Sequence, residues 1–238
     1  MTIKAILFDK DGTLLDFDAT FAPATANVLA ALAKGNAQQL AKLAEAVDFD
    51  LASGAILPGS VLVAGSLENI AEALMPHTGH ADLATCLEEV DGLYVKYSLE
   101  SLAAFPFLNA CLDELAAMGL ELGVATNDSE EAAYAHLDQM GITARFGFIA
   151  GYDSGFGEKP QPGMVSAFVD HLGLAPGEVM MVGDSPHDLK AGNGAGAISV
   201  GVTSGGATAD QLAPLANHVV ADISHLPALV RQLKDGGT

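Results

Sequence analysis

The chain has 238 residues, half of them hydrophobic, and a formal net charge of −20 with only ten Lys and Arg. This length is enough for a sizeable core and suits one domain with a second domain inserted into it. Nucleic acids and anionic membrane surfaces are bound through basic patches, so we expect neither as a partner. An anionic substrate would need a metal ion and a few well-placed cations.

The two cysteines, Cys86 and Cys111, lie far apart and lack the spacing of metal ligands. We expect buried, reduced thiols of the kind found in cytoplasmic proteins. No apolar run reaches membrane-spanning length, and a strand with a charged tail follows Met1 directly, so no signal peptide is expected. These features predict a cytoplasmic protein, and the sequence sets no oligomeric state.

The first predicted element is a buried strand over residues 2–8, which runs into Asp9. From residue 18 to about residue 100 the apolar spacing is helical, with breaks at 58–60 and 76–79. The predicted helices span 19–34, 38–47, 61–74 and 81–97. With no convincing strand in this stretch, residues 18–100 are predicted to form an inserted all-helical domain.

After residue 106, short apolar runs alternate with helical stretches. The predicted strands span 121–125, 146–150, 179–182, 197–202 and 219–220. The predicted helices span 108–118, 129–140, 163–172, 189–194 and 226–233. This alternation predicts an α/β fold with a mainly parallel, doubly wound, Rossmann-like sheet. Residues 1–17 and 101–238 would form this core.

Polar residues follow the first strand and several later ones. They are Asp9 and Asp11, Thr126 and Asn127, Lys159 after a loop, and Asp184 and Asp188. In a parallel sheet these positions converge on one edge. Two carboxylates at i and i+2 repel each other unless a cation lies between them, and hard oxygen ligands suit Mg²⁺. We therefore expect a magnesium site at this edge.

The same residues stand in four motifs whose order resembles that of the haloacid dehalogenase superfamily of hydrolases. The motifs are Asp-Lys-Asp-Gly-Thr at 9–13, Ala-Thr-Asn at 125–127, Lys-Pro at 159–160, and Gly-Asp-Ser-x-x-Asp at 183–188. The resemblance covers the whole chain, and the helical block corresponds in position to the helical cap domain of many members. It implies a Mg²⁺-dependent core with a cap at residues 18–100.

The resemblance implies different roles for the first two carboxylates. Asp9 would be the nucleophile, forming an aspartyl-phosphate, and also a metal ligand. Asp11 would be the general acid and then the general base, and its backbone carbonyl would bind Mg²⁺. Taken alone, each would be read as a turn or capping residue. A halide leaves without a proton whereas an alkoxide needs one, so Asp11 favours a phosphatase over a dehalogenase.

The other motifs supply the remaining expected site residues. Thr126 and Lys159 would stabilise the transferring phosphoryl group, Lys159 as a point cation that also neutralises Asp9. Gly12 and Asn127 would contact the substrate. By the same resemblance, Asp184 would bind Mg²⁺ directly and Asp188 through water.

Two neighbouring features are assigned no such role. His187 is expected to be a solvated loop residue. The glycine-rich stretch 192–196 follows a predicted helix and precedes a strand, the reverse of the order in a phosphate-binding loop, so it is expected to stop the helix.

Within the superfamily, the motifs look most like those of the phosphoglycolate phosphatase group. The expected substrate is thus a small phosphomonoester, although Lys34 and Lys42 in the cap are more simply read as solvated. Two alternatives stay open: a sugar phosphomutase of β-phosphoglucomutase type, which shares the core motifs, and a non-catalytic phosphate-binding regulator. Receiver domains are set aside, because they are shorter and lack a helical insertion after the first strand.

Overall fold

The computed structural model describes residues 2–235 of the chain, which divide into two compact units. The first unit takes the chain up to Asp16 and again from Ala104 onward, and the second unit consists of Phe17–Ala103. The chain therefore leaves the first unit soon after its first strand and completes the second unit before it returns. Each unit has hydrophobic core residues of its own.

The first unit is built on a six-stranded parallel sheet with the strand order β5-β4-β1-β6-β7-β8. Its strands are β1 (Ala5–Phe8), β4 (Glu121–Ala125), β5 (Phe148–Ala150), β6 (Val179–Gly183), β7 (Ile198–Val202) and β8 (His218–Val220). Strand β1 pairs with both β4 and β6, so the first strand of the chain lies at the centre of the sheet. The predicted α/β fold with a parallel sheet is confirmed, although the first strand begins at Ala5 rather than at residue 2.

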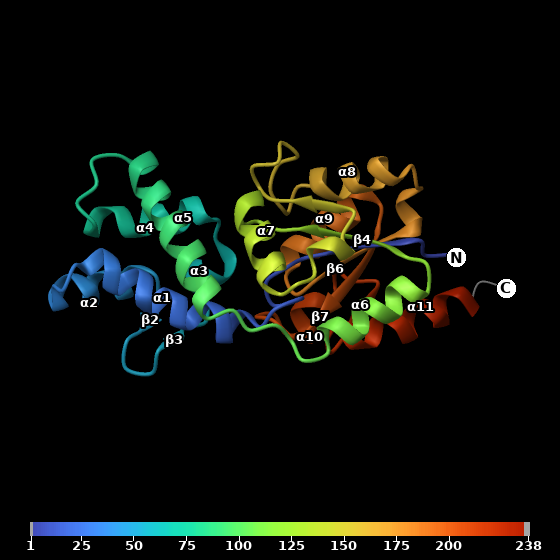
Figure 1. Ribbon diagram of the computed structural model, residues 1–238, viewed down its shortest axis with the longest axis horizontal. Helices are drawn as coiled ribbons and strands as arrows, with labels where there is room; N and C mark the ends of the chain where they lie inside the picture. The colour runs from blue at the N-terminus through green and yellow to red at the C-terminus, as the bar shows by residue number, and fades with distance from the viewer. Residues whose placement is uncertain (1, 236–238) are drawn as a thin grey trace. The chain divides into compact units, whose positions relative to one another are not determined.

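Helices cover both faces of this sheet, as expected of a doubly wound fold (Figure 1). The helices of the unit are α6 (Leu108–Ala117), α7 (Glu130–Gln139), α8 (Gly163–Leu172), α9 (Pro186–Ala195), α10 (Ala209–Leu212) and α11 (Leu226–Asp235). Side chains alternate along β1. Ile6 and Phe8 join the core formed with α6 and α11, and Ala5 and Leu7 join the core formed with α8 and α9. The short helix α10 was not predicted.

The second unit is mostly helical. Its helices are α1 (Phe17–Ala33), α2 (Ala37–Ala46), α3 (Val61–Ala64), α4 (Leu67–Leu74) and α5 (Leu83–Glu100). Their apolar faces share one core that includes Val28, Leu43 and Val90.

Two local predictions for this unit were wrong. A small antiparallel hairpin, β2 (Phe49–Asp50) with β3 (Ala55–Ile56), interrupts the predicted all-helical block. The predicted helix 61–74 is broken at Gly65, which is extended, and Ser66 then caps the start of α4. Strands of two residues are too short to show an alternating pattern, and the apolar spacing continues across the break at Gly65.

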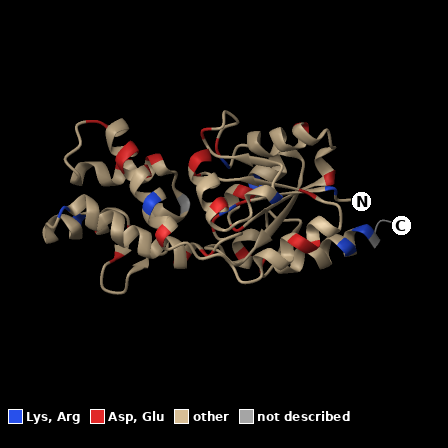
Figure 2. Cartoon of the chain, in the orientation of Figure 1, with Lys and Arg blue, Asp and Glu red and all other residues tan. Residues whose placement is uncertain are grey.

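Acidic residues are spread over both units rather than gathered on one segment (Figure 2). Among the described residues, no helix is both long enough and apolar enough to cross a membrane.

Candidate active site

The candidate site lies in the first unit, at the carboxyl ends of its three central strands. Asp9 follows β1, and its N–H donates to the Val182 carbonyl at 2.8 Å. Thr126 follows β4, and its N–H donates to the Ala150 carbonyl at 3.0 Å. Asp184 follows β6 directly. The strand order β4-β1-β6 thus brings these three residues to one edge of the sheet.

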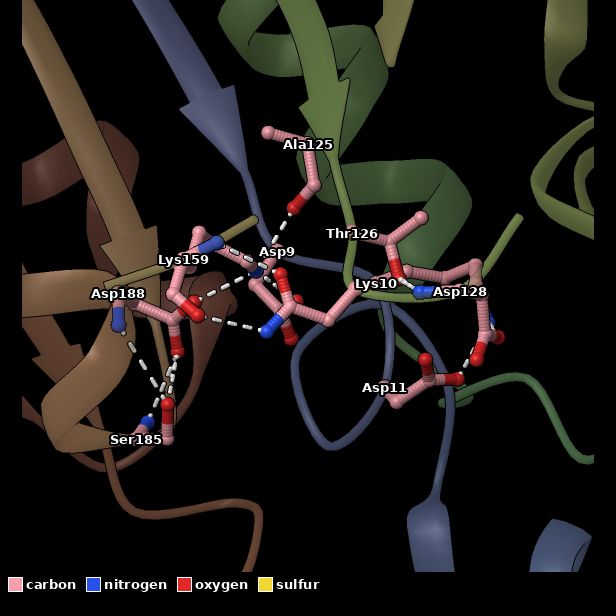
Figure 3. Close-up of polar contacts among 10 residues, drawn as sticks. Asp9, Lys10, Asp11, Ala125, Thr126, Asp128, Lys159, Ser185 and Asp188 are labelled. Carbon is pink, nitrogen blue, oxygen red and sulfur yellow. Dashed lines mark hydrogen bonds and ion pairs between the residues drawn. The ribbon is translucent and has the colours of Figure 1, made fainter. Parts of the chain in front are cut away.

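Lys159 is the cation at the centre of this edge, and its side chain is 3% exposed. Its Nζ lies 2.6 Å from Asp9 Oδ1 and 2.6 Å from Asp188 Oδ1, and it donates to the Ala125 carbonyl at 2.8 Å (Figure 3). Burial opposes the charge on Lys159, yet Asp188 and Asp9 together raise the pKa of its ammonium above the ordinary value. Lys159 is therefore charged, and it joins the end of β1 to the first turn of α9.

Asn127 fixes the backbone of Lys159. Its Oδ1 accepts a hydrogen bond from the Lys159 N–H at 2.8 Å, and its Nδ2 donates to the Lys159 carbonyl at 2.9 Å. Both polar atoms of the amide are thus engaged with the chain itself. The substrate contact expected of Asn127 stays a prediction, whereas its hold on Lys159 is part of the structure.

Three carboxylates lie close enough together to hold a metal ion. Each of Asp9, Asp184 and Asp188 offers an oxygen that lies within 4.8 Å of the oxygens of the other two. When all are ionised, the three carboxylates and the Lys159 ammonium together carry two negative charges. Oxygen donors and this charge fit a divalent cation such as Mg²⁺.

The three carboxylates differ in how many contacts they already have. Asp188 directs Oδ1 to Lys159, and its Oδ2 accepts from the N–H and hydroxyl of Ser185 at 3.0 and 2.7 Å. Asp184 Oδ2 accepts one bond, from the Gly206 N–H at 3.0 Å. Both oxygens of Asp188 are thus engaged, whereas Asp184 has a single contact, and the direct and water-mediated metal roles expected of these residues stay predictions.

The acidic charges raise one another's pKa values. Burial raises the pKa of Asp9 to about 7 against the lowering effect of Lys159, and the charges of Asp188 and Asp11 add to the rise. Burial, with the charges of Asp9 and Asp188, raises the pKa of Asp184 to about 8. The protein alone therefore does not fully neutralise these carboxylates, which is what a cation site requires.

Glycines pack directly against two of these carboxylates. A Cβ at Gly205 would lie 1.8 Å from Asp184 Oδ2, and one at Gly12 would lie 2.6 Å from the same oxygen. A Cβ at Gly183 would lie 2.3 Å from Asp188 Cγ. Gly12 also has φ +76°, which a side chain would disfavour. Because these three residues lack a Cβ, the Asp184 and Asp188 carboxylates can pack directly against their backbone.

The Asp11 carboxylate belongs to a second group of polar residues. Lys10 Nζ lies 2.5 Å from Asp11 Oδ1, 2.7 Å from Asp128 Oδ2 and 3.0 Å from His136 Nδ1 (Figure 3). Burial raises the pKa of Asp11 to about 7, the charge of Lys10 opposes this rise, and that of Asp128 adds to it. The metal role expected of Asp11 concerns its backbone carbonyl and stays a prediction.

Thr126 contacts the second group. Its side chain is buried, and its Oγ1 accepts a hydrogen bond from the Asp128 N–H at 3.1 Å. In this contact the oxygen is the acceptor, so the hydroxyl keeps its own hydrogen as a donor, and the phosphoryl contact expected of Thr126 stays a prediction.

Of the nearby features given no role in the site, the stretch 192–196 ends α9 as expected. Gly196 has φ +77° and forms its left-handed C-cap. Lys10, Asp128, His136 and Gly205 were not among the residues predicted for the site. Lys10 lies inside a motif and Asp128 directly follows one, whereas His136 and Gly205 are brought to the site by the fold alone.

The sequence resembles those of known proteins over most of its length. The sequence pattern described as haloacid dehalogenase-like hydrolase matches residues 3–196. A curated relative, the phosphoglycolate phosphatase of Rhodospirillum rubrum, is 33% identical over 221 residues, which cover 92% of this chain and 87% of that protein.

Solved structures share the fold at lower sequence identity. A crystal structure described as a predicted phosphoglycolate phosphatase from Haemophilus somnus matches with a TM-score of 0.74 at 20% identity, covering 96% of this chain and 98% of that one. The β-phosphoglucomutase of Clostridium difficile matches with a TM-score of 0.67 at 21% identity, covering 99% of this chain and 98% of that one. At these identities the likeness concerns the fold.

Proposed function

Because the chain belongs to the haloacid dehalogenase-like hydrolase family, we propose that it is a phosphatase that hydrolyses a small phosphomonoester through an aspartyl-phosphate. The observation that carries the proposal is the pair at the end of β1. Asp9 is bound to Lys159 beside an acidic group that suits a metal ion, and Asp11 lies apart with its own cation, Lys10. The two carboxylates are therefore in different surroundings, as two different roles require.

In the first step, a carboxylate oxygen of Asp9 attacks phosphorus. A bond forms between this oxygen and phosphorus as the bond from phosphorus to the alcohol oxygen breaks. Asp11, as the acid, gives its proton to the departing alkoxide. Lys159 and the Thr126 hydroxyl stabilise the charge on the transferring phosphoryl oxygens.

In the second step, water attacks the phosphorus of the aspartyl-phosphate. Asp11, now a carboxylate, takes a proton from this water, and the bond between phosphorus and Asp9 breaks to give inorganic phosphate and the free carboxylate. A pKa of about 7 suits Asp11 to both directions of proton transfer near neutral pH.

Mg²⁺ would be held by Asp9, the Asp11 backbone carbonyl and Asp184, with Asp188 acting through water. When bound, the ion would offset the negative charge gathered by the carboxylates and the phosphate. Gly12, whose backbone packs against Asp184, is kept as a proposed substrate contact.

The substrate we propose is 2-phosphoglycolate or a closely similar small phosphomonoester, after the relative named phosphoglycolate phosphatase. We propose that the unit 17–103 is the cap that selects it. In this unit Lys34 and Lys42 are both exposed, which is compatible with the simpler reading that they are solvated. Cys86 and Cys111 are buried free thiols, which is compatible with the cytoplasmic location that we propose.

The test is phosphate release from a panel of esters that includes 2-phosphoglycolate and sugar phosphates, with and without Mg²⁺. Asp9→Asn should lower turnover to about a thousandth or less, and Asp11→Asn should lower it about 100-fold or more. Asp170→Asn, at an exposed position on α8, is the matched control and should keep near-normal turnover. Near-normal turnover in Asp9→Asn, with the fold intact by circular dichroism, would contradict the mechanism.

The same panel distinguishes the alternatives. Conversion of a sugar phosphate into its isomer, with little free phosphate, would favour a phosphomutase like the structural neighbour from Clostridium difficile. Inertness of the wild-type protein toward every ester with Mg²⁺ would favour a non-catalytic phosphate-binding regulator.

A further inference from the structure

Lys10 is a fully buried lysine that the two-step reaction above does not use. It stands between Asp9 and Asp11 in the chain, yet its side chain turns away from the metal group. Its Nζ contacts Asp11 in the loop after β1 and Asp128 in the loop after β4 (Figure 3). It also contacts His136 of helix α7. Burying an ammonium costs free energy unless it is paired and hydrogen-bonded, and the contacts of Lys10 offset this cost.

Asp11, Asp128 and His136 would by themselves resemble a second metal site. One ligand atom from each lies within 4.8 Å of those of the other two. The Lys10 ammonium, however, already lies 2.5, 2.7 and 3.0 Å from these residues. The cation that this group holds is therefore the side chain of Lys10.

The geometry of an ammonium suits this group. It has three hydrogens to donate, and Asp11 Oδ1, Asp128 Oδ2 and His136 Nδ1 can take one each. Burial and the charge of Lys10 lower the pKa of His136 to about 3, so its ring is neutral and Nδ1 can accept. Asp128 is anchored in turn, because its N–H donates to Thr126 and its carbonyl accepts from the Tyr152 N–H.

We propose that Lys10 is a positioning residue, which holds the Asp11 carboxylate where it can exchange a proton with the leaving group. The proposal rests on the proposed phosphatase function. Lys10 binds Asp11 Oδ1 and is itself held by Asp128 and His136, so the ammonium fixes the Asp11 side chain through one of its oxygens. Without the ammonium, the Asp11 and Asp128 carboxylates would face each other with no cation between them, and Asp11 would turn away.

A distinctive consequence concerns the leaving group. An alkyl alcohol leaves poorly unless it is protonated, whereas p-nitrophenolate leaves without a proton. A fault in the placement of Asp11 therefore slows alkyl esters selectively. General damage to the fold would slow both classes of ester alike.

The experiment measures alcohol or phenol release in the first turnover, with 2-phosphoglycolate and with p-nitrophenyl phosphate, in the Mg²⁺-loaded protein. Lys10→Met should slow the alkyl ester about 100-fold and p-nitrophenyl phosphate less than about 5-fold, with KM little changed. Asp11→Asn should show the same selectivity, and the double variant Lys10→Met/Asp11→Asn should lose little beyond Asp11→Asn alone. Lys190→Met, at an exposed lysine of α9, is the matched control and should behave as wild type.

A second variant guards against misfolding, since Lys10→Met leaves Asp128 without its cation. Lys10→Met/Asp128→Asn removes both charges and should show the same selectivity. Equal slowing of the two esters in a folded variant, or no slowing of either, would overturn the role of Lys10 while the phosphatase function stands. If wild type released neither product from either ester, the proposed function itself would fail, and the role of Lys10 with it.

Discussion

At Asp184, backbone rather than side chains sets the position of the carboxylate. Gly12 and Gly205 both come so close to Oδ2 that a Cβ at either position would overlap it, and the Gly206 N–H donates to the same oxygen. The loops after β1 and β7 thus hold this carboxylate from two sides. The requirement at Gly205 is for space, because no unusual backbone angle accompanies it.

Gly205→Ala should therefore displace Asp184 and weaken its proposed hold on Mg²⁺. We expect the Mg²⁺ concentration needed for half-maximal activity to rise about 10-fold or more, as when groups that support metal ligands are changed. The measurement is activity against Mg²⁺ concentration. Gly177→Ala is the control, because a Cβ there would meet nothing within 4 Å. An unchanged Mg²⁺ requirement in Gly205→Ala would contradict direct binding by Asp184.

The sequence predicts some of the clustered residues and misses others for a physical reason. Asp9, Thr126 and Asp184 each follow a strand, and a parallel sheet brings strand ends together whatever lies between them. Lys10 and His136 are 126 positions apart, and no spacing rule joins them. Their contact depends on how α7 packs in the first unit, and no local sequence pattern predicts this packing.

The loop that carries Lys159 relies on Asn127 for its place at the site. The two hydrogen bonds of the Asn127 side-chain amide join the loop after β4 to the Lys159 backbone. They lie next to the cis peptide bond between Lys159 and Pro160. Asn127, a residue of the predicted motif, thereby also holds the loop that carries the Lys159 ammonium.

Asn127→Ala should release this loop, so that Lys159 binds Asp9 less well. We expect kcat to fall about 10- to 100-fold, because misplacement of a charge-stabilising group is felt mainly in the transition state. Steady-state kinetics with the best ester of the panel would measure the change, with Asn109→Ala, at an exposed residue of α6, as the control. If KM rose while kcat stayed the same, Asn127 would instead be binding the substrate, as the motif alone predicts.

At the level of elements, prediction works where pattern and length agree. The predicted limits of β4 and α8 are those of the structure. The hairpin β2–β3 was missed, because it depends on a tight turn around Asp50 and Gly54 rather than on alternation. The break at Gly65 had a local signal, Ser66 followed three residues later by Asn69, which form a capping box.

The whole molecule carries a net charge of −20, and its acidic residues lie on both units (Figure 2). An anionic phosphomonoester approaches such a protein against a repulsive field, which dissolved salt screens. The cations at the candidate site, Lys159 and Lys10, are buried and paired, so they add little attraction at a distance.

We therefore expect kcat/KM for an anionic ester to rise about 2- to 3-fold as NaCl increases from roughly 20 to 200 mM at saturating Mg²⁺. Because screening affects the encounter, kcat should change little. Initial rates at low substrate concentration would measure the effect. A fall in kcat/KM with salt would instead indicate a local positive field around the site.

The central place of β1 has a consequence for how the protein forms. Ala5 pairs with Glu121 of β4 on one side and with Val179 of β6 on the other. The first strand to be synthesised therefore cannot pair until these two later strands have been made. The contacts within Phe17–Ala103 are closer in sequence and can form during that wait. Lys159 can join Asp9 to Asp188 only after β6 and the start of α9 have been made. The complete charged cluster is then among the last features that the growing chain acquires.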